Sequence, residues 1–322
     1  MTETLMQVRD LGMHFGGGSK AAHPVRAVDR VSFDVLRGES FGIVGESGSG
    51  KTTLGRCLMQ ILKPSAGSVK FNGKRHSGVE LTKIDAKALR DIWRDIRMVF
   101  QDPQSSLNPR LRVIDLIGQS LQQAEGLKGQ VLAERVSELL LQVGLRPEFL
   151  MRYPNAFSGG QRQRLGIARA LATQPELIIA DEAVSALDVS IQAQTLNLLM
   201  DLQADFDLTY VFIAHDLAVV EHFCDRIAVM YRGRIVELAR TQTLFATPRH
   251  PYTRALLASV PIPDPRARKS RGKSKPTEAT PNPEGCQFAP RCPHATELCH
   301  NTRPTPRAIG GADVLCHFAG EI

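Results

Sequence analysis

The sequence lacks the features of an integral membrane or secreted protein. None of its 322 residues lies in a run approaching the ~18 apolar residues that a membrane-spanning helix needs. The first ten residues, MTETLMQVRD, lack the charged and then apolar pattern of a secretory signal. The chain also shows no internal repeat. We therefore expect a protein that is kept in the cytosol unless a membrane partner holds it at the bilayer.

Cysteine is scarce and unevenly distributed. Only six occur, and four of them, Cys286, Cys292, Cys299 and Cys316, lie in the last 37 residues. A disulfide framework is not expected in a reducing cytosol. The C-x5-C-x6-C-x16-C segment is too small to build a core alone, so a bound metal could supply its folding energy. Zinc and an iron–sulfur cluster both accept four thiolates, and the spacings are wider than those usual for structural zinc.

Excess positive charge is concentrated in one segment. The chain carries a net charge of +7, which suits nucleic acid, anionic lipid or phosphate ligands. The segment RARKSRGKSK, residues 266–275, holds six positive charges and no negative one. It lies in a stretch rich in proline and charge that has no apolar period. We interpret this stretch as a solvated linker.

Apolar strand-like runs alternate with amphipathic helical runs as far as about residue 255. This alternation predicts an α/β layered fold. The predicted strands are 40–45, 176–181 and 208–215, followed by a hairpin over 226–238, and the predicted helices are 131–145 and 190–206. The second helix is expected to bury Ile191, Leu198, Leu199, Leu202 and Phe206.

The segment GESGSGKT, residues 45–52, predicts a phosphate-binding loop. It follows an apolar strand-like run, opens an apolar helix-like one and fits G-x-x-x-x-G-K-[ST]. Glycines let successive backbone N–H groups point at phosphate oxygens, and the helix N-terminus adds partial positive charge. Lys51 is expected to reach the β and γ phosphates of ATP, and the Thr52 hydroxyl to hold Mg²⁺. The expected nucleotide-binding residues here are Gly45, Glu46, Ser47, Gly48, Ser49, Gly50, Lys51, Thr52 and Thr53.

The segment LIIADE, residues 177–182, predicts the acidic half of the same site. Four apolar residues form a strand that ends in two carboxylates. Asp181 is placed to bind Mg²⁺, largely through its water. Glu182 is placed to polarise the attacking water, as a general base or a water-orienting group. Such a strand is common on its own, and the upstream phosphate loop gives this one its significance.

The segment FSGGQRQR, residues 157–164, indicates which class of phosphate-loop ATPase this is. Its serine and two glycines create a second phosphate-binding helix N-terminus, which a single chain does not need for one γ-phosphate. The segment resembles the L-S-G-G-Q signature of ABC-type ATPases. In that family the signature of one subunit closes over the ATP held by another. The resemblance implies that Ser158, Gly159, Gly160 and Gln161 act in trans.

Other segments resemble further elements of that family, in the same order. Gln101, in MVFQDPQ, matches the Q-loop glutamine, which senses the γ-phosphate and touches the membrane subunit. The segment SALD, which ends at Asp188, matches the D-loop that communicates across the dimer. His215 matches the switch histidine, which implies catalytic roles for Glu182, His215 and Gln101. Phe15 corresponds to the aromatic residue that stacks on adenine.

Longer segments narrow the resemblance to ATP-binding subunits of dipeptide, oligopeptide and nickel importers. They are AVDRVSFDVLRGESFGIVGESGSGKTTLGR, VFQDPQSSLNPR, DEAVSALDVSIQAQ and HPYTRALLASVP. The cysteine tail also resembles the C-terminal extension of peptide-importer ATPases. That resemblance implies a [4Fe–4S] cluster on Cys286, Cys292, Cys299 and Cys316.

The resemblance covers essentially the whole chain and implies its organisation. The fold expected is an ABC-type ATPase core with a mixed, largely parallel sheet, an antiparallel β subdomain, a helical subdomain and a short cysteine-rich extension. The ATPase domain would occupy residues 1–258, with the helical subdomain at about 102–172. A linker would follow over 259–284, and the extension over 285–322.

The implied function is ATP hydrolysis that drives import of dipeptides or oligopeptides across the cytoplasmic membrane. The implied cofactors are ATP and Mg²⁺. The implied partners are two transmembrane permease subunits, a second and different ABC ATPase subunit and, indirectly, an extracytoplasmic substrate-binding protein. The chain would lie on the cytoplasmic face of the inner membrane. Nickel or another small solute remains an alternative cargo.

Two residues depart from the family pattern. Ala183 follows Glu182 where the importer branch usually has proline, so the turn after the carboxylate could be looser. The signature begins with Phe157 instead of leucine, which is an apolar exchange.

Two other functions are alternatives to transport. A nucleic-acid ATPase of the same superfamily would carry an inserted coiled coil, a zinc module or a second cassette, and none is visible, so no nucleic-acid partner is expected. A cassette that binds ATP without hydrolysing it would not need Glu182 and His215.

Overall fold

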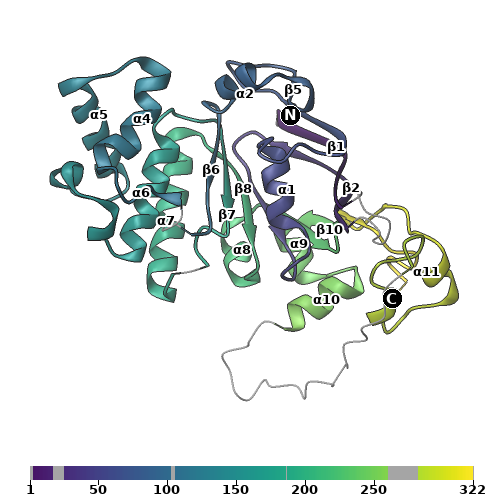
Figure 1. The fold of residues 1–322 in the computed structure, drawn as a ribbon. Helices are drawn as coiled ribbons and strands as arrows, with labels where there is room; N and C mark the ends of the chain where they lie inside the picture. The colour runs from purple at the N-terminus through teal and green to yellow at the C-terminus, as the bar shows by residue number, and fades with distance from the viewer. Residues whose placement is uncertain (1–2, 17–24, 103–105, 186, 260–281, 322) are drawn as a thin grey trace.

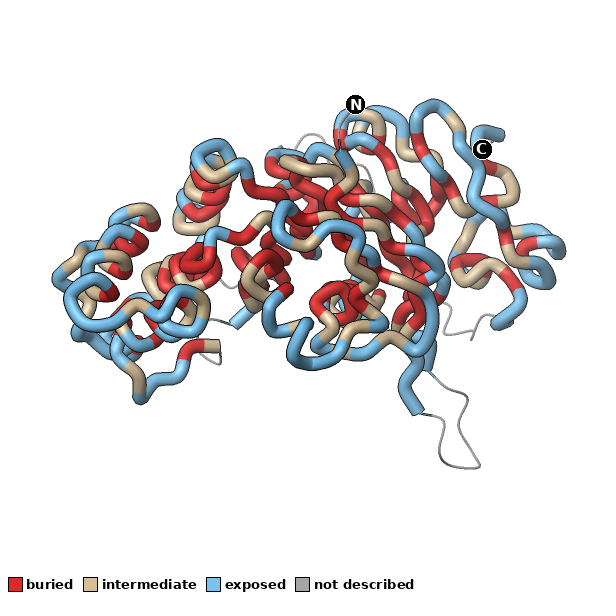
Figure 2. The backbone as a smooth tube through the Cα atoms, turned by 90° about the horizontal axis from the view of Figure 1, so that it is seen from above, coloured by how far each residue is buried: buried red, intermediate tan, exposed pale blue. Residues whose placement is uncertain are grey.

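The computed structural model describes residues 3–16, 25–102, 106–185, 187–259 and 282–321. Two sheets and a group of helices share two hydrophobic cores (Figure 1). Seen from above, buried backbone runs through the middle of the molecule, and exposed residues lie on the helical side and on the outer loops (Figure 2). Within these described ranges, no helix has the length and apolar character to cross a membrane.

The larger sheet carries the parallel core of the fold. Its strand order is β11-β12-β10-β9-β3-β8-β7-β6, and the neighbours from β9 to β6 run parallel. Every residue of β3, β7 and β8 is buried, as expected for strands covered on both faces. The strands of this sheet are β3 (Ser40–Val44), β6 (Ile96–Val99), β7 (Leu177–Asp181), β8 (Thr209–Ala214), β9 (Arg226–Tyr231) and the antiparallel β10 (Arg234–Arg240), β11 (Arg307–Ile309) and β12 (Ala312–Val314).

Alternating residues of the parallel strands face two different cores. Val211 and Ile213 of β8 pack in the core that also contains Leu54 and Leu58 of α1 (Lys51–Leu58). Tyr210 and Phe212 pack in the other core, which includes residues of α8 (Leu217–Phe223). The phosphate-loop helix therefore lies between the large sheet and the second sheet.

The second sheet is antiparallel, with strand order β2-β1-β4-β5. Its strands are β1 (Thr4–Phe15), β2 (Val25–Leu36), β4 (Ala66–Phe71) and β5 (Val79–Glu80). The short η1 (Leu81–Lys83) and α2 (Ala86–Ile92) follow it and lead into β6. Together the two sheets confirm the predicted mixed sheet and antiparallel β layer.

Helices form a separate layer beyond β6 and β7 (Figure 1). They are α4 (Val113–Glu125), α5 (Gly129–Gln142), η2 (Pro147–Met151), η3 (Pro154–Ala156), α6 (Gly159–Leu171) and α7 (Val189–Phe206). The buried face of α7 differs from the predicted one. Thr195 and Leu196 are buried with Leu199 and Leu202, whereas Ile191, Leu198 and Phe206 are only half-buried. The stripe is rotated because α7 packs against both α6 and the sheet.

The C-terminal extension joins the large sheet. After α9 (Thr241–Ala246) and α10 (Pro251–Ala258), the described chain resumes with η5 (Ala289–Arg291), α11 (Glu297–Asn301), β11 (Arg307–Ile309) and β12 (Ala312–Val314). Strand β12 pairs antiparallel with β10, with Glu237 opposite Val314. Phe288, Ala312 and Val314 belong to the main core. The extension therefore shares the hydrophobic core of the ATPase sheet. The sequence analysis treated the extension as a separate small segment and did not predict this packing.

Candidate functional site

The phosphate loop connects β3 to α1, and its shape depends on glycine. Gly45 has φ 155° and Gly50 has φ 102°. A Cβ atom at Gly45 would collide with the carbonyl oxygen of Met230, and one at Gly50 with that of Ala27. Only glycine allows both the positive φ and this close backbone approach. The loop is therefore held against β2 and the end of β9.

Lys51 lies inside the curl of this loop. Its Nζ donates to the carbonyl oxygen of Gly45 at 2.8 Å and to that of Glu46 at 3.1 Å. The residue is only 5% exposed, and burial lowers the pKa of its ammonium while Glu182 and Asp181 oppose that shift. Among the described residues no carboxylate forms an ion pair with Lys51, and such a buried cation suits an anionic ligand that brings its own charge.

Thr52 and Asp181 meet at the carboxyl end of β7. The Thr52 hydroxyl donates to Asp181 Oδ1 at 3.1 Å. Asp181 is 2% exposed, and burial raises the pKa of its carboxyl, partly offset by the hydrogen bond from Thr52. A hydroxyl and a buried carboxylate beside a phosphate loop form an oxygen-rich position of the kind Mg²⁺ prefers.

Glu182 is held by two other predicted residues. Gln101 Nε2 donates to Glu182 Oε2 at 2.8 Å, and His215 Nδ1 lies 3.3 Å from the same oxygen. The backbone of Glu182 has φ 47°, a conformation that is costly for a residue with a side chain. Its N–H donates to the carbonyl of Ile213 at 2.9 Å, which holds this turn on β8. The carboxylate is thus fixed at the sheet edge by three elements.

The turn after Glu182 is closed without the usual proline. Ser185 donates to the Glu182 carbonyl oxygen twice, from its N–H at 3.1 Å and from its hydroxyl at 2.9 Å. Ala183 is buried at 3% exposure. The looser turn expected from Ala183 is therefore restrained by Ser185.

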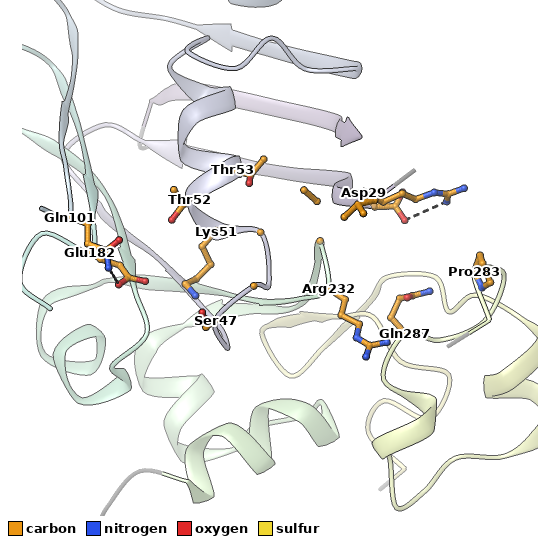
Figure 3. Close-up of a pocket in the computed structure, with 16 residues that line it drawn as sticks. Asp29, Ser47, Lys51, Thr52, Thr53, Gln101, Glu182, Arg232, Pro283 and Gln287 are labelled. Carbon is orange, nitrogen blue, oxygen red and sulfur yellow. Dashed lines mark hydrogen bonds and ion pairs between the residues drawn. The ribbon is translucent and has the colours of Figure 1, made fainter. Parts of the chain in front are cut away.

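Lys51, Thr52, Gln101 and Glu182 line one cavity of about 670 Å³ (Figure 3). The predicted residues Gly45, Glu46, Ser49, Asp181 and His215 are not among its described lining residues. In Figure 3, Gln101 and Glu182 lie on one side of Lys51, and Arg232, Gln287 and Pro283 lie on the other. Its lining comprises Ser47, Gly48, Gly50, Lys51, Thr52, Thr53, Gln101 and Glu182, with Val25, Arg26, Ala27, Asp29, Arg232, Gly233, Pro283 and Gln287. The second group was missed from sequence because no local pattern marks it.

Phe15 does not line this cavity. It is the last residue of β1 and is 41% exposed. Residues 17–24, which follow it, lie outside the described ranges. Its proposed adenine contact therefore stays a prediction.

The signature segment lies apart from the chain's own cavity. Ser158 caps α6 in a capping box: its hydroxyl accepts from Gln161 N–H at 3.3 Å, and Gln161 Oε1 accepts from Ser158 N–H at 3.0 Å. Ser158 and Gly159 are exposed, and Gly160 packs on Ile191. Asp188, at the start of α7, is exposed too, while Ala186 of the same loop lies outside the described residues. The N-terminus of α6 is therefore ordered by its capping box and accessible at the surface.

The cysteines fall into two groups. Cys57 and Cys224 are buried in the two cores. The four tail cysteines line one small cavity together with His250, His294, His317, Phe288 and Phe318. Burial raises the pKa of Cys286 to about 11, and Cys299 and Cys316 add to that rise. No group of three or more His, Cys, Asp or Glu side chains in the described part of the chain is arranged to hold a metal ion.

Comparison with protein families gives two matches. Residues 28–185 match the ABC transporter family, and residues 236–299 match the oligopeptide/dipeptide transporter C-terminal region. A putative peptide import ATP-binding protein of Brucella abortus is 48% identical over 96% of each chain. A putative oligopeptide transport ATP-binding protein of Bacillus subtilis is 47% identical, over 98% of this chain and 95% of its own. The di/tripeptide transport ATP-binding protein DppF of Pseudomonas aeruginosa is 46% identical over 99% of each.

Solved structures agree with these relatives. A dimeric ATP-binding cassette in a post-hydrolysis state, bound to ADP and phosphate, superposes with a TM-score of 0.65 at 28% identity. It covers 74% of this chain and 99% of its own. CbiO1 of Clostridium perfringens gives the same TM-score at 25% identity, over 76% and 92%. From the ordered site, the fold and these relatives together, the chain belongs to the ABC transporter family, as one of its ATP-binding ATPases.

Proposed function

We propose that this ATPase energises the import of dipeptides or oligopeptides through a membrane permease. One observation carries the hydrolytic part: Lys51, Thr52, Gln101 and Glu182 line a single cavity, with Asp181 bonded to Thr52 and His215 beside Glu182. Relatives named for peptide transport, at 46–48% identity over nearly the whole chain, support the cargo. The match of residues 236–299 to the oligopeptide/dipeptide transporter C-terminal region supports it independently.

Each residue has a role that follows from its position. Lys51 turns from the loop carbonyls to the β and γ phosphates of ATP. Thr52 and Asp181 hold Mg²⁺, which when bound neutralises phosphate charge. Glu182 accepts a hydrogen bond from the attacking water and orients it. His215 and Gln101 fix the Glu182 carboxylate and report the presence of the γ-phosphate.

A second ABC ATPase subunit completes the site. The α6 N-terminus is exposed at Ser158 and Gly159, and neither residue is among the described residues that line the chain's own cavity. Ser158, Gly159, Gly160 and Gln161 therefore act on ATP held by the partner, and Asp188 lies at the same junction. We propose a heterodimer of ATPase subunits, with each signature closing over the other's nucleotide.

The permease contact is assigned to the helical layer. Large apolar side chains are exposed there, among them Leu141, Met151 and Tyr153. Such side chains suit short helices of two membrane permease subunits at the cytoplasmic face of the inner membrane. In this organisation residues 1–258 form the ATPase domain, about 102–172 its helical part, 259–284 the linker and 285–322 the extension. An extracytoplasmic binding protein delivers the cargo to the permease.

The cysteine cavity is proposed to hold a [4Fe–4S] cluster. Cys286, Cys292, Cys299 and Cys316 line one cavity and four thiolates are the usual donor set of such a cluster, but their placement in the described structure is not that of metal ligands. Anaerobic purification followed by iron, sulfide and zinc analysis tests this. About four irons and four sulfides per chain, lost in a Cys292→Ser variant, would support the cluster. One zinc, or no metal, would contradict it.

The transport function is tested by reconstitution. The chain, its permease, the partner ATPase and the binding protein are placed in vesicles, and ATP-dependent uptake of a labelled dipeptide is measured. Uptake that requires both ATP and the binding protein supports the proposal. Vesicles that take up nickel but no peptide would assign the alternative cargo. Stimulation of ATP hydrolysis by DNA or RNA, without the permease, would contradict transport.

A further inference from the structure

The C-terminal extension contacts the phosphate loop directly. Arg291 Nη1 and Nη2 donate to Glu46 Oε2 and Oε1, each at 2.9 Å, although the residues are 245 positions apart. A two-bond contact between guanidinium and carboxylate is strong for its class and fixes orientation. Both side chains are part-exposed, at 34% and 44%, so solvent screens part of the attraction. We therefore expect this contact to orient the Glu46 side chain more than to stabilise the fold.

An aromatic cluster holds Arg291 in place. Its guanidinium lies 5.7 Å from the ring centres of both Tyr231 and Phe288. Those rings contact Tyr252, which is fully buried, and each other at centroid distances of 4.5–5.5 Å. Arg291 itself ends η5, a short turn inside the extension. The position of the Arg291 guanidinium is therefore set by these aromatic contacts as well as by Glu46.

Glu46 is restrained at three separate groups. Its side chain binds Arg291, its N–H donates to the Tyr252 hydroxyl at 2.9 Å, and its carbonyl oxygen accepts from Lys51 Nζ at 3.1 Å. The last contact makes the position of Lys51 depend on that of Glu46. A loop held in this way loses little conformational freedom when ATP binds. Gln287 of the same extension also lines the cavity, together with Pro283 at the end of the linker.

The charge of Glu46 gives the pairing a second effect. An unpaired carboxylate in the phosphate loop would repel the ATP phosphates, although solvent at the part-exposed Glu46 side chain screens some of that repulsion. Arg291 neutralises that carboxylate in the structure. Loss of Arg291 would therefore weaken nucleotide binding by releasing both the loop and the charge.

We propose that Arg291 is a positioning residue of the nucleotide site: through Glu46 it holds the phosphate loop in its ATP-binding form. The C-terminal extension is thereby a part of the ATP site. This inference rests on the proposed role of the Lys51 loop in binding ATP.

The test is equilibrium binding of a fluorescent ATP analogue with Mg²⁺ to the purified full-length chain. Arg291→Gln should raise Kd about 5–20-fold, as expected for losing a part-exposed charged hydrogen-bond pair. Arg291→Lys keeps the charge and loses the two-bond geometry, so its Kd should lie between. The double variant Arg291→Gln, Glu46→Gln should bind more tightly than Arg291→Gln but less tightly than wild type, because the unpaired carboxylate is gone while the loop still lacks its two-bond contact.

A matched control separates this role from general damage to the extension. Arg307 forms an exposed ion pair with Glu321 in the same extension, and Arg307→Gln should leave Kd within about twofold. The proposal is overturned if Arg291→Gln binds within twofold of wild type, or if the double variant binds no more tightly than Arg291→Gln. Should Arg291→Gln fail to fold, Arg291→Lys decides by the same criterion. Wild-type protein that binds no nucleotide would contradict the proposed function instead.

Discussion

The two ends of the parallel strands carry similar residues in different states. At the carboxyl ends, Lys51 and Glu182 line an open cavity, and the Lys51 ammonium donates to the carbonyl oxygens of Gly45 and Glu46. At the amino ends, carboxylates are paired with cations: Glu39 with Arg226 at 3.3 Å, and Glu176 with Arg37. The charged groups that line the cavity at the carboxyl ends can bind a ligand, whereas those at the amino ends form ion pairs between segments of the chain.

This difference assigns function and stability to opposite edges of one sheet. Open α/β sheets bind ligands outside the carboxyl ends of their strands, because the loops there differ while the strands remain fixed. Charges that await a ligand are costly without it, so removing one should impair activity without lowering stability. Removing a charge from the amino end should do the reverse.

Glu182→Gln should have the largest effect. Gln keeps the shape but accepts a proton poorly, so ATP turnover should fall by roughly 10²–10⁴-fold. The measurement is ATP hydrolysis by the assembled transporter, alongside thermal unfolding of the isolated chain. The melting temperature without nucleotide should be unchanged or higher. Near-normal hydrolysis would remove Glu182 from its role, and a large loss of stability would break the division between the two edges.

Lys51→Met should act on binding. The side chain keeps its apolar length but loses the ammonium, so Kd for Mg·ATP should rise about 10–100-fold, as for loss of a charged hydrogen bond. The folded protein should be no less stable, because burial already disfavours the Lys51 charge. Fluorescent nucleotide titration and thermal unfolding measure both quantities. Tight ATP binding by this variant would mean that the loop binds phosphate through its backbone alone.

Asp95→Asn tests the opposite edge. Asp95 precedes β6, is fully buried, and has Oδ1 2.7 Å from Arg75 Nε and Oδ2 2.7 Å from His76 Nδ1. Its loss should lower the free energy of unfolding by about 1–3 kcal/mol. Urea unfolding measures this, and Kd for ATP of the folded protein should stay within about twofold. Weakened nucleotide binding at full stability would show that the amino edge also serves the site.

The parts of the fold that sequence predicted share one property: their signals are local. Strands β3, β7 and β8 agree with prediction to within about a residue because buried parallel strands are continuous apolar runs. The loop at Lys51 and the Asp181–Glu182 strand end are likewise defined by neighbours in the chain. What brings Gln101 to Glu182 is the pairing of β6 with β7, which the sequence analysis did not predict; the family resemblance implied only that both residues act in catalysis.

The parts that sequence did not predict depend on distant contacts. The pairing of β12 with β10 and the contact of Arg291 with Glu46 join segments that have no matching local pattern. The buried stripe of α7 passes through Leu196 because its neighbours, rather than its own periodicity, select the face. Arg232 and Gln287 likewise reach the cavity through contacts between segments that are distant in the sequence.

The pH dependence of stability should give the smallest effect, through His76. Its hydrogen bond to Asp95, aided by one to Asp91, raises the pKa of the imidazole above its usual value near 6.5. The folded form therefore holds this proton more tightly than the unfolded form. Its contribution is fully present below the unfolded pKa, near 6.5, and is lost as pH rises through the raised folded pKa. Urea unfolding across pH 6–9 should show this decline of the free energy of unfolding in wild type and a flatter profile in His76→Gln. The control variant His222→Gln, which changes an exposed histidine on α8, should keep the wild-type profile. Equal slopes in wild type and His76→Gln would show that the amino-edge pair at Asp95 does not depend on the imidazole charge.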